Sequence, residues 1–259
     1  MRLLLVPSFT ELEWGIRPQL EEWADVATFD MPGTGEEPLP DGLRRDDFVR
    51  GIDHDALMAW RDAGATRALA EVERRNWKSF IVATDSHGAP TAVRVAERSP
   101  DAALGLALGH ASLSSDTEGD RAPMRGEIWA AFGQLASQGK EEFVRYGLAQ
   151  MTRGGIAEDL ADEMIERFHD MDLVAAMVNA LGRESEPIGD HVAALGIPLL
   201  LAKHEGCLGR TDEGWEDIVA AFPDAQKVVC PETCSSSPSF AAALQRFCHE
   251  VMHEHSDAS

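Results

Sequence analysis

A serine stands where an apolar run ends, at Ser86 within residues 80–90, FIVATDSHGAP. Asp85 precedes this serine, and His87 and Gly88 follow it, ahead of an Ala- and Val-rich segment. A serine on a sharp strand-to-helix turn directs its hydroxyl into a cleft, where it can attack a carbonyl carbon. The backbone N–H of His87 would then lie at a helix N-terminus and stabilise a developing oxyanion. A simpler interpretation is that Ser86 only caps a helix.

A nucleophilic serine needs a base to remove its proton, and the base needs an acid to orient it. We expect His110 to be the base, because it follows the strand that should lie beside the strand of Ser86. His204 and His87 are further candidates. Asp85 is also a candidate base, since burial of a carboxyl group raises its pKa. A carboxylate there would also repel an alkoxide, and it equally suits the stabilisation of a helix N-terminus.

The composition argues against several classes of function. The chain has 259 residues and a formal net charge of −22, with 44% apolar and 26% charged residues. This acidic excess opposes binding to nucleic acid and to anionic membranes, both of which require clustered Lys and Arg. The apolar run at Leu3–Val6 is too short for a signal peptide, so we expect a cytoplasmic protein without a nucleic-acid or membrane partner. A homodimer is left open.

Apolar runs alternate with helical periodicity along the chain. The alternation predicts an α/β protein with a mostly parallel sheet of about six strands and helices on both faces. The predicted strands are Leu3–Val6, Val26–Phe29, Phe80–Ala83, Leu104–Leu108, Pro198–Ala202 and Lys227–Cys230. The predicted helices beside them are Leu12–Trp23, Asp53–Arg74, Pro90–Arg98, Glu213–Phe222 and Pro238–Met252.

One region lacks any strand pattern and predicts helices alone. These helices are Ala122–Gln138, Glu141–Met151, Ala157–His169 and Leu173–Leu181. We therefore predict an α/β core formed by residues 1–111 and 196–259, with an all-helical insertion at residues 112–195.

Three segments that follow or form strands resemble the α/β-hydrolase superfamily. DMPGTG, residues 30–35, is similar to its D-x-P-G-x-G turn. TDSHGAPTAVRVAERSPD, residues 84–101, is similar to its nucleophile elbow and the helix that follows. GIPLLL, residues 196–201, resembles the strand that leads to its acid. The resemblance covers essentially the whole chain, without the first two strands of the family.

The resemblance implies roles for particular residues. Ser86 is the implied nucleophile, and the backbone N–H of Ser8 or Phe9 is the implied second oxyanion donor beside that of His87. The helical insertion corresponds to the family's cap. A cap presents apolar side chains to a ligand, and we expect Trp129, Phe132, Tyr146 and Phe168 to contribute, although helical spacing also fits packing between the cap helices.

Two catalytic positions of the family look unfilled in this chain. The acid position falls near Cys207, where Glu205 is the nearest carboxylate, and the histidine position falls within Pro231–Phe240, which contains no histidine. By the same resemblance, Cys207 and Cys234 lie close to these positions. They are either two thiols, as a reducing compartment favours, or a disulfide.

We expect an enzyme that hydrolyses an ester or thioester of a small hydrophobic molecule, with Ser86 as nucleophile and a displaced histidine as base. The alternative is a lyase, cyclase or isomerase, or a ligand binder without turnover, that uses the same capped pocket. No cofactor or metal is expected. Cys230 and Cys234 lack the partners of a zinc site, and Gly33–Gly35 lacks a phosphate-binding pattern.

Overall fold

The sheet is built from parallel strands only. The computed structural model describes residues 1–8, 14–35, 37–44, 54–111, 113, 122–148, 158–168, 170–183, 187–205 and 212–257. Within these ranges six strands form one sheet in the order β2-β1-β3-β4-β5-β6, and each neighbouring pair is parallel. The strands are β1 (Arg2–Val6), β2 (Asp25–Ala27), β3 (Phe80–Asp85), β4 (Ala103–Gly109), β5 (Leu199–His204) and β6 (Gln226–Cys230). The predicted fold class is confirmed.

Both faces of the sheet are buried, which explains the continuous apolar runs of the strands. Leu4 and Val6 of β1 belong to the hydrophobic core on one face, and Leu3 and Leu5 belong to the core on the other. The same alternation continues along β3 and β4. Each strand therefore holds two layers of helices in place.

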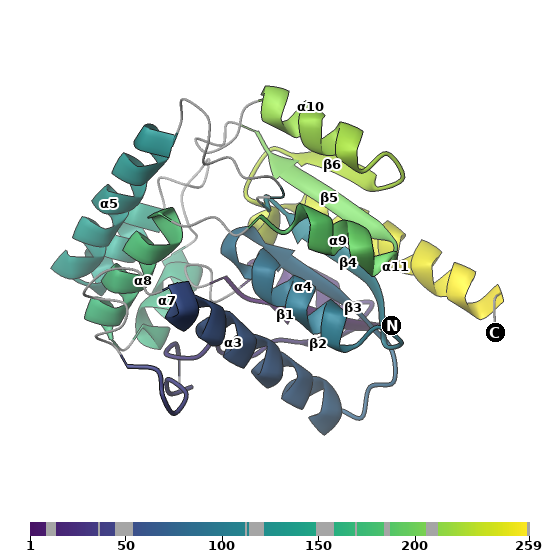
Figure 1. Cartoon of the computed structure of the whole chain (residues 1–259), viewed down its shortest axis with the longest axis horizontal. Helices are drawn as coiled ribbons and strands as arrows, with labels where there is room; N and C mark the ends of the chain where they lie inside the picture. The colour runs from purple at the N-terminus through teal and green to yellow at the C-terminus, as the bar shows by residue number, and fades with distance from the viewer. Residues whose placement is uncertain are drawn as a thin grey trace.

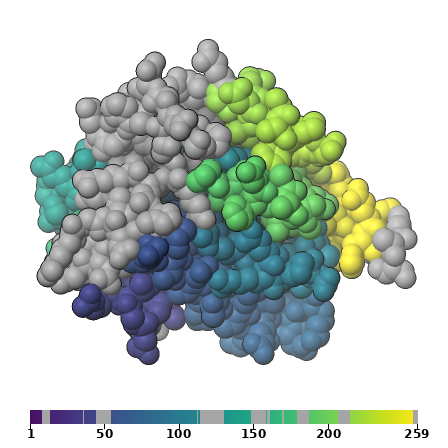
Figure 2. All heavy atoms as spheres, viewed as in Figure 1, coloured from purple at the N-terminus to yellow at the C-terminus, as the bar shows by residue number. Residues whose placement is uncertain are grey.

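Helices cover the two faces in separate layers. They are α1 (Arg17–Glu21), α3 (His54–Arg74), α4 (Ala89–Arg98), α9 (Gly189–Leu195), α10 (Asp212–Ala221) and α11 (Pro238–Asp257). The core on one face contains residues of α3, α4, α9 and α10, and the core on the other contains residues of α1 and α11. Figure 1 shows α3, α4 and α9 in front of the sheet, and Figure 2 shows them as one continuous outer surface.

Several helices differ from the sequence prediction, among them α11, which continues to Asp257 beyond the predicted end at Met252. The first helix begins at Arg17 rather than Leu12, because Pro18 stands in its first turn, where its fixed φ favours helix initiation. The short helix α9 was not predicted. It follows Ile188, and no side chain caps its N-terminus, so its sequence lacks the usual cap residue and has only Asp190 in the first turn as a start signal.

Among the described residues, four helical elements besides α9 lie between β4 and β5, where the sequence predicts an all-helical insertion. They are α5 (Ala122–Gln138), the π-helix η3 (Glu142–Leu148), α7 (Glu158–Arg167) and α8 (Met171–Arg183), and we call them the insertion helices. Figure 1 places α5 and α8 together on the side of the molecule away from the C-terminal end of α11. Phe143 and Phe168 pack edge to face within this group, with their ring centroids 5.5 Å apart.

The turn at residues 30–35 docks the insertion helices onto the sheet. The guanidinium of Arg167 in α7 forms an ion pair with Asp30, and the carbonyl of Arg167 accepts the N–H of Gly35 at 3.2 Å. A Cβ at Gly33 would lie 2.8 Å from a methyl group of Leu173 in α8. Side chains and backbone of the insertion therefore contact one turn that follows β2.

We expect Arg167→Met to destabilise this docking. The substitution leaves the partly buried Asp30 carboxylate without its cation, which costs about 1–3 kcal/mol of unfolding free energy. Urea denaturation gives the loss, and limited proteolysis shows whether the insertion helices become the first site of cleavage. Arg17→Met is the matched control, because the ion pair of Arg17 with Glu21, one turn along α1, is exposed to solvent. Equal losses in both variants would contradict the docking role.

Candidate active site

Ser86 lies in a strained turn between β3 and α4. Its φ is +52°, in the left-handed region that non-glycine residues rarely adopt. Ser86 is the first residue of the short 3-10 helix η1 (Ser86–Gly88), which precedes α4. The N-cap residue of α4 itself is Gly88. Ser86 is therefore not the cap of α4, and the half-buried side chain stands at the carboxyl end of a central strand.

This turn is close-packed around Gly88. A Cβ at Gly88 would lie 2.1 Å from the hydroxyl of Thr84 and 3.0 Å from the carbonyl oxygens of Val6 and Pro7. The Thr84 hydroxyl is itself held in place, because it donates a hydrogen bond to the Val6 carbonyl at 2.9 Å. The chain can turn here only with glycine two residues after the serine.

Strand register brings three of the predicted residues into one row. Val6 in β1 pairs with Thr84 in β3, which pairs with Leu108 in β4. The residues two positions further along are Ser8, Ser86 and His110. Since parallel strands end at the same edge of a sheet, the register directs Ser8, Ser86 and His110 to that one edge. The prediction that the strand before His110 lies beside the strand of Ser86 is confirmed, whereas the approach of the His110 ring to Ser86 stays a prediction.

His110 also contacts a second imidazole. Its φ is +46°, and its N–H donates to the Ala202 carbonyl of β5 at 2.8 Å. The ring centroids of His110 and His204 are 4.6 Å apart, with an angle of 47° between the planes. Nδ1 of His204 lies 3.3 Å from the carbonyl oxygen of Glu205. Two of the three candidate histidines therefore meet at the ends of β4 and β5.

Asp85, the last residue of β3, is buried and directed away from the helix that follows. Its carboxylate accepts the backbone N–H of Ser235 at 2.8 Å, and it faces Gly109 and Cys234. Burial raises the pKa of Asp85, and the Ser235 N–H and the nearby His204 partly oppose this rise. The Asp85 side chain makes no cap hydrogen bond to η1, and the interpretation that its charge stabilises the helix N-terminus stays a prediction.

The turn after β6 occupies the place where the resemblance puts a histidine. It contains the 3-10 element η4 (Cys234–Ser236), in which Cys234 and Ser235 are buried. Cys234 is a buried thiol rather than half of a disulfide, whereas Cys207 lies outside the described residues. Small side chains let this turn close onto Asp85 and Gly109.

The predicted ligand-wall residues have different environments. Phe132 and Phe168 are buried in the core of the insertion helices, whereas Tyr146 is 63% exposed. Trp129 lies in α5, but its side chain is outside the described part of the chain, as is Phe9, the proposed oxyanion donor. The assignment of these residues to a ligand wall stays a prediction.

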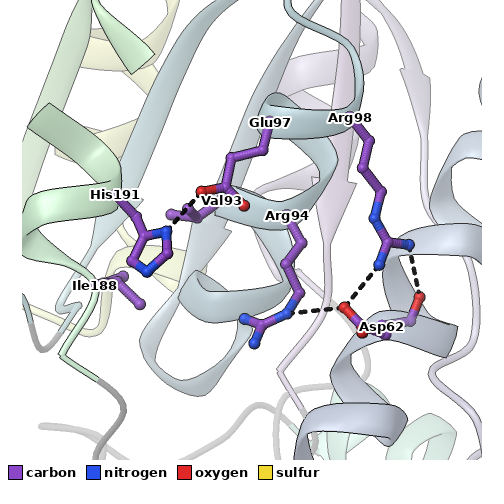
Figure 3. A pocket seen from close by; sticks show the side chains of 7 residues that line it. All are labelled: Asp62, Val93, Arg94, Glu97, Arg98, Ile188 and His191. Carbon is purple, nitrogen blue, oxygen red and sulfur yellow. Dashed lines mark hydrogen bonds and ion pairs between the residues drawn. The ribbon is translucent and has the colours of Figure 1, made fainter. Parts of the chain in front are cut away.

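A polar hollow on another face is not part of this row. It lies between α3, α4 and α9 and contains Arg94, Arg98 and Asp62 as well as the His191–Glu97 pair (Figure 3). Both arginines donate to Asp62, at 3.0 and 2.7 Å. The arginines lie in the C-terminal half of α4, at the opposite end of that helix from Ser86. The carboxylate of Asp62 therefore already neutralises part of the positive charge of these two arginines.

No group of three or more His, Cys, Asp or Glu side chains in the described ranges is arranged to hold a metal ion. Among the helices that the structure describes, none is long and apolar enough to cross a membrane.

Sequence reasoning missed two contacts of this region. The hydrogen bond from Ser235 to Asp85 spans 150 residues, and the Asp30–Arg167 ion pair spans 137. Neither has a local sequence signal. The only hint for the first was the lack of a histidine in the turn after β6.

We expect Gly88→Ala to destabilise the fold by about 1–3 kcal/mol, because the added methyl overlaps the Thr84 hydroxyl and two carbonyl oxygens. Chemical denaturation measures the loss. Gly64→Ala in α3 is the control, since its nearest neighbour is the flexible tip of Met31 and alanine favours the helix. A smaller loss at Gly88 than at Gly64 would contradict the packing argument.

We expect the stability of Asp85→Asn relative to the wild type to increase with pH. At pH values between the ordinary aspartate pKa of the unfolded chain and the raised pKa of folded Asp85, the folded protein binds more protons than the unfolded chain. The unfolding free energy of the wild type therefore falls as pH rises through this window. Asparagine does not titrate, and its oxygen can still accept the Ser235 N–H.

Urea denaturation of both proteins from about pH 4 to about pH 8 tests this expectation, with the exposed Asp41→Asn as the control. A stability difference that does not change with pH would show that folding leaves the pKa of Asp85 unchanged, which would contradict the raised pKa.

Solved structures of low sequence identity share this architecture. MenH from S. aureus matches with a TM-score of 0.69 at 16% identity, over 97% of this chain and 94% of that chain. A haloalkane dehalogenase variant from Bradyrhizobium elkanii matches with a TM-score of 0.67 at 12% identity, over 100% and 92%. A thermophilic esterase from Thermogutta terrifontis matches with a TM-score of 0.65 at 18% identity, over 97% and 90%.

No protein-family model and no curated protein matches the chain. The fold is nevertheless defined by these structures and by the six parallel strands with helices on both faces. The chain has the α/β-hydrolase fold.

Proposed function

We propose that the protein is a hydrolase that cleaves an ester or thioester of a small hydrophobic molecule, with the hydroxyl of Ser86 as the nucleophile. The left-handed Ser86 in the close-packed turn after β3 carries this proposal. Backbone strain of this kind persists only where the surrounding structure enforces it, and it is frequent at nucleophiles. A serine with no chemical role would need neither the positive φ nor the obligatory glycine.

The neighbouring groups supply the remaining roles of such a reaction. His110 accepts the proton of the Ser86 hydroxyl while the oxygen attacks the carbonyl carbon. The N–H groups of His87 and Ser8 stabilise the oxyanion, as the strand register supports for Ser8. Collapse of this intermediate expels the alcohol or thiol, which takes the proton from His110. Water then attacks the acyl-enzyme with His110 again as base, releasing the carboxylic acid and restoring Ser86.

The comparisons support hydrolysis as the class of reaction. Solved structures of the same fold include the thermophilic esterase and an E-2-(acetamidomethylene)succinate hydrolase. A shared fold at this level of identity is compatible with several chemistries, so the Ser86 turn carries more weight than the neighbours do.

The insertion helices support an apolar ligand. They dock beside the carboxyl ends of the strands through the 30–35 turn, as a cap over the site would. Their core contains Met164, Met177 and Phe168, and a methionine-rich helical layer adapts to irregular hydrophobic molecules. We therefore favour a hydrophobic acyl group over a sugar or a phosphate.

One observation favours the second candidate, a non-hydrolytic enzyme or a ligand binder. The turn of residues 231–237 provides the Ser235 N–H to Asp85 where a hydrolase would place its histidine. A carboxylate beside Ser86 also raises the cost of an alkoxide. The following experiment separates the two candidates.

We expect the wild type to hydrolyse p-nitrophenyl butyrate and to be labelled by a fluorophosphonate probe. Ser86→Ala should abolish both, and His110→Ala should lower kcat/KM by about 10²-fold or more, because the base is lost. Ser137→Ala is the matched control, since this exposed hydroxyl donates only to the Gln134 carbonyl. Turnover that survives Ser86→Ala, or a wild type that is neither active nor labelled, would refute the hydrolase proposal in favour of the second candidate.

A further inference from the structure

Three ionisable side chains form a connected group next to Ser86. Asp85 and His204 interact electrostatically, and His204 contacts His110 ring to ring at 4.6 Å. His110 in turn follows Gly109, the register partner of Asp85, and Asp85 directly precedes Ser86 in the chain. These groups come from the ends of three different strands, β3, β4 and β5.

The carboxylate at one end of this group is fixed in position. Asp85 is 2% exposed and accepts the Ser235 N–H at 2.8 Å, so its side chain cannot swing into solvent. Charges that are held rigidly in a site of low dielectric constant act most strongly on their neighbours. By contrast, Glu205, the carboxylate nearest to the family's acid position, is exposed to solvent. Water screens an exposed carboxylate of this kind.

His204 is placed to connect the carboxylate with the base. It is the last residue of β5 and pairs with Cys230, so its backbone is fixed by the sheet on the side of β6. The Glu205 N–H donates to the Cys230 carbonyl at 2.8 Å, which holds the residue after His204 as well. The neighbouring Lys203 lies over the ring of Trp215 in α10, away from this group.

We propose that Asp85 replaces the missing acid of the site and acts through His204, which is a positioning residue for the His110 ring. This inference rests on the proposed hydrolase function. Once it is ionised, Asp85 orients His204 by its charge, and His204 restricts the ring of His110 to the orientation that faces Ser86. The nucleophile and its orienting acid are then adjacent in sequence, and the imidazoles come from the next two strands.

Kinetics of four variants test the chain of contacts. Asp85→Asn keeps an acceptor for Ser235 but removes the charge, and His204→Phe keeps a ring but removes its nitrogens. We expect each to lower kcat by about 10²-fold with little change in KM, because a positioning group acts on the reacting geometry. The double variant should be no slower than either single variant, since the two residues act as one unit.

Glu205→Gln is the matched comparison for the loss of charge, and we expect it to retain wild-type kcat. A loss as large as that of Asp85→Asn would assign the acid to Glu205 and overturn the proposal. Full activity in His204→Phe would show that only ring packing is required. Multiplicative losses in the double variant would show that the two residues act separately.

A measurement that needs no turnover separates this inference from the proposed function. Imidazole 15N NMR of the full chain should show that Asp85→Asn shifts the resonances of His204. Glu205→Gln is the reference variant for this shift, and the resonances of the distant His191 are the internal reference. If Ser86-dependent hydrolysis is absent, the hydrolase proposal fails while the shift still reports on the coupling. If hydrolysis is present and Asp85→Asn leaves the His204 resonances unchanged, the coupling fails alone.

Discussion

The absence of space for a Cβ at Gly88 is the constraint on which the site depends. The Thr84 hydroxyl, which bonds to the Val6 carbonyl, fills the volume on one side, and two carbonyl oxygens of the β1 end close the other. The chain must therefore leave β3 in one sharp turn, and this turn forces Ser86 to a positive φ. A contact between two neighbouring strands thus decides the direction of the serine, before any catalytic partner is considered.

The register of the central strands extends this constraint to the partners of Ser86. Because β1, β3 and β4 are parallel and in register at Val6, Thr84 and Leu108, their next residues emerge at one level. A shift of one residue in either pair would turn alternate side chains to the other face of the sheet. The two buried faces, with their alternating apolar side chains, prevent such a shift. The precision of the site is therefore a consequence of core packing.

The sequence predicted the strands well because a strand buried on both faces is a continuous apolar run. It placed the ends of β3 and β5 too early, at Ala83 and Ala202, since Asp85 and His204 are polar residues that sheet pairing includes. The neighbouring position of β4, which precedes His110, and β3, which precedes Ser86, followed from the order of the predicted strands alone. The contact of Asp85 with Ser235 could not be predicted, because it joins segments 150 residues apart through a backbone N–H that any residue could provide.

The energetics of Asp85 argue that this residue is more than a structural link to the turn after β6. An asparagine would accept the same Ser235 N–H and would avoid the cost of burying a carboxylate, which the raised pKa of Asp85 reflects. A single neutral hydrogen bond therefore does not account for an ionisable group at this position. Its charge can interact with His204, and an amide cannot reproduce that interaction. Burying a carboxyl group next to the strained Ser86 costs free energy. This cost is consistent with a site in which the electrostatic role of Asp85, rather than its packing, requires aspartate at this position.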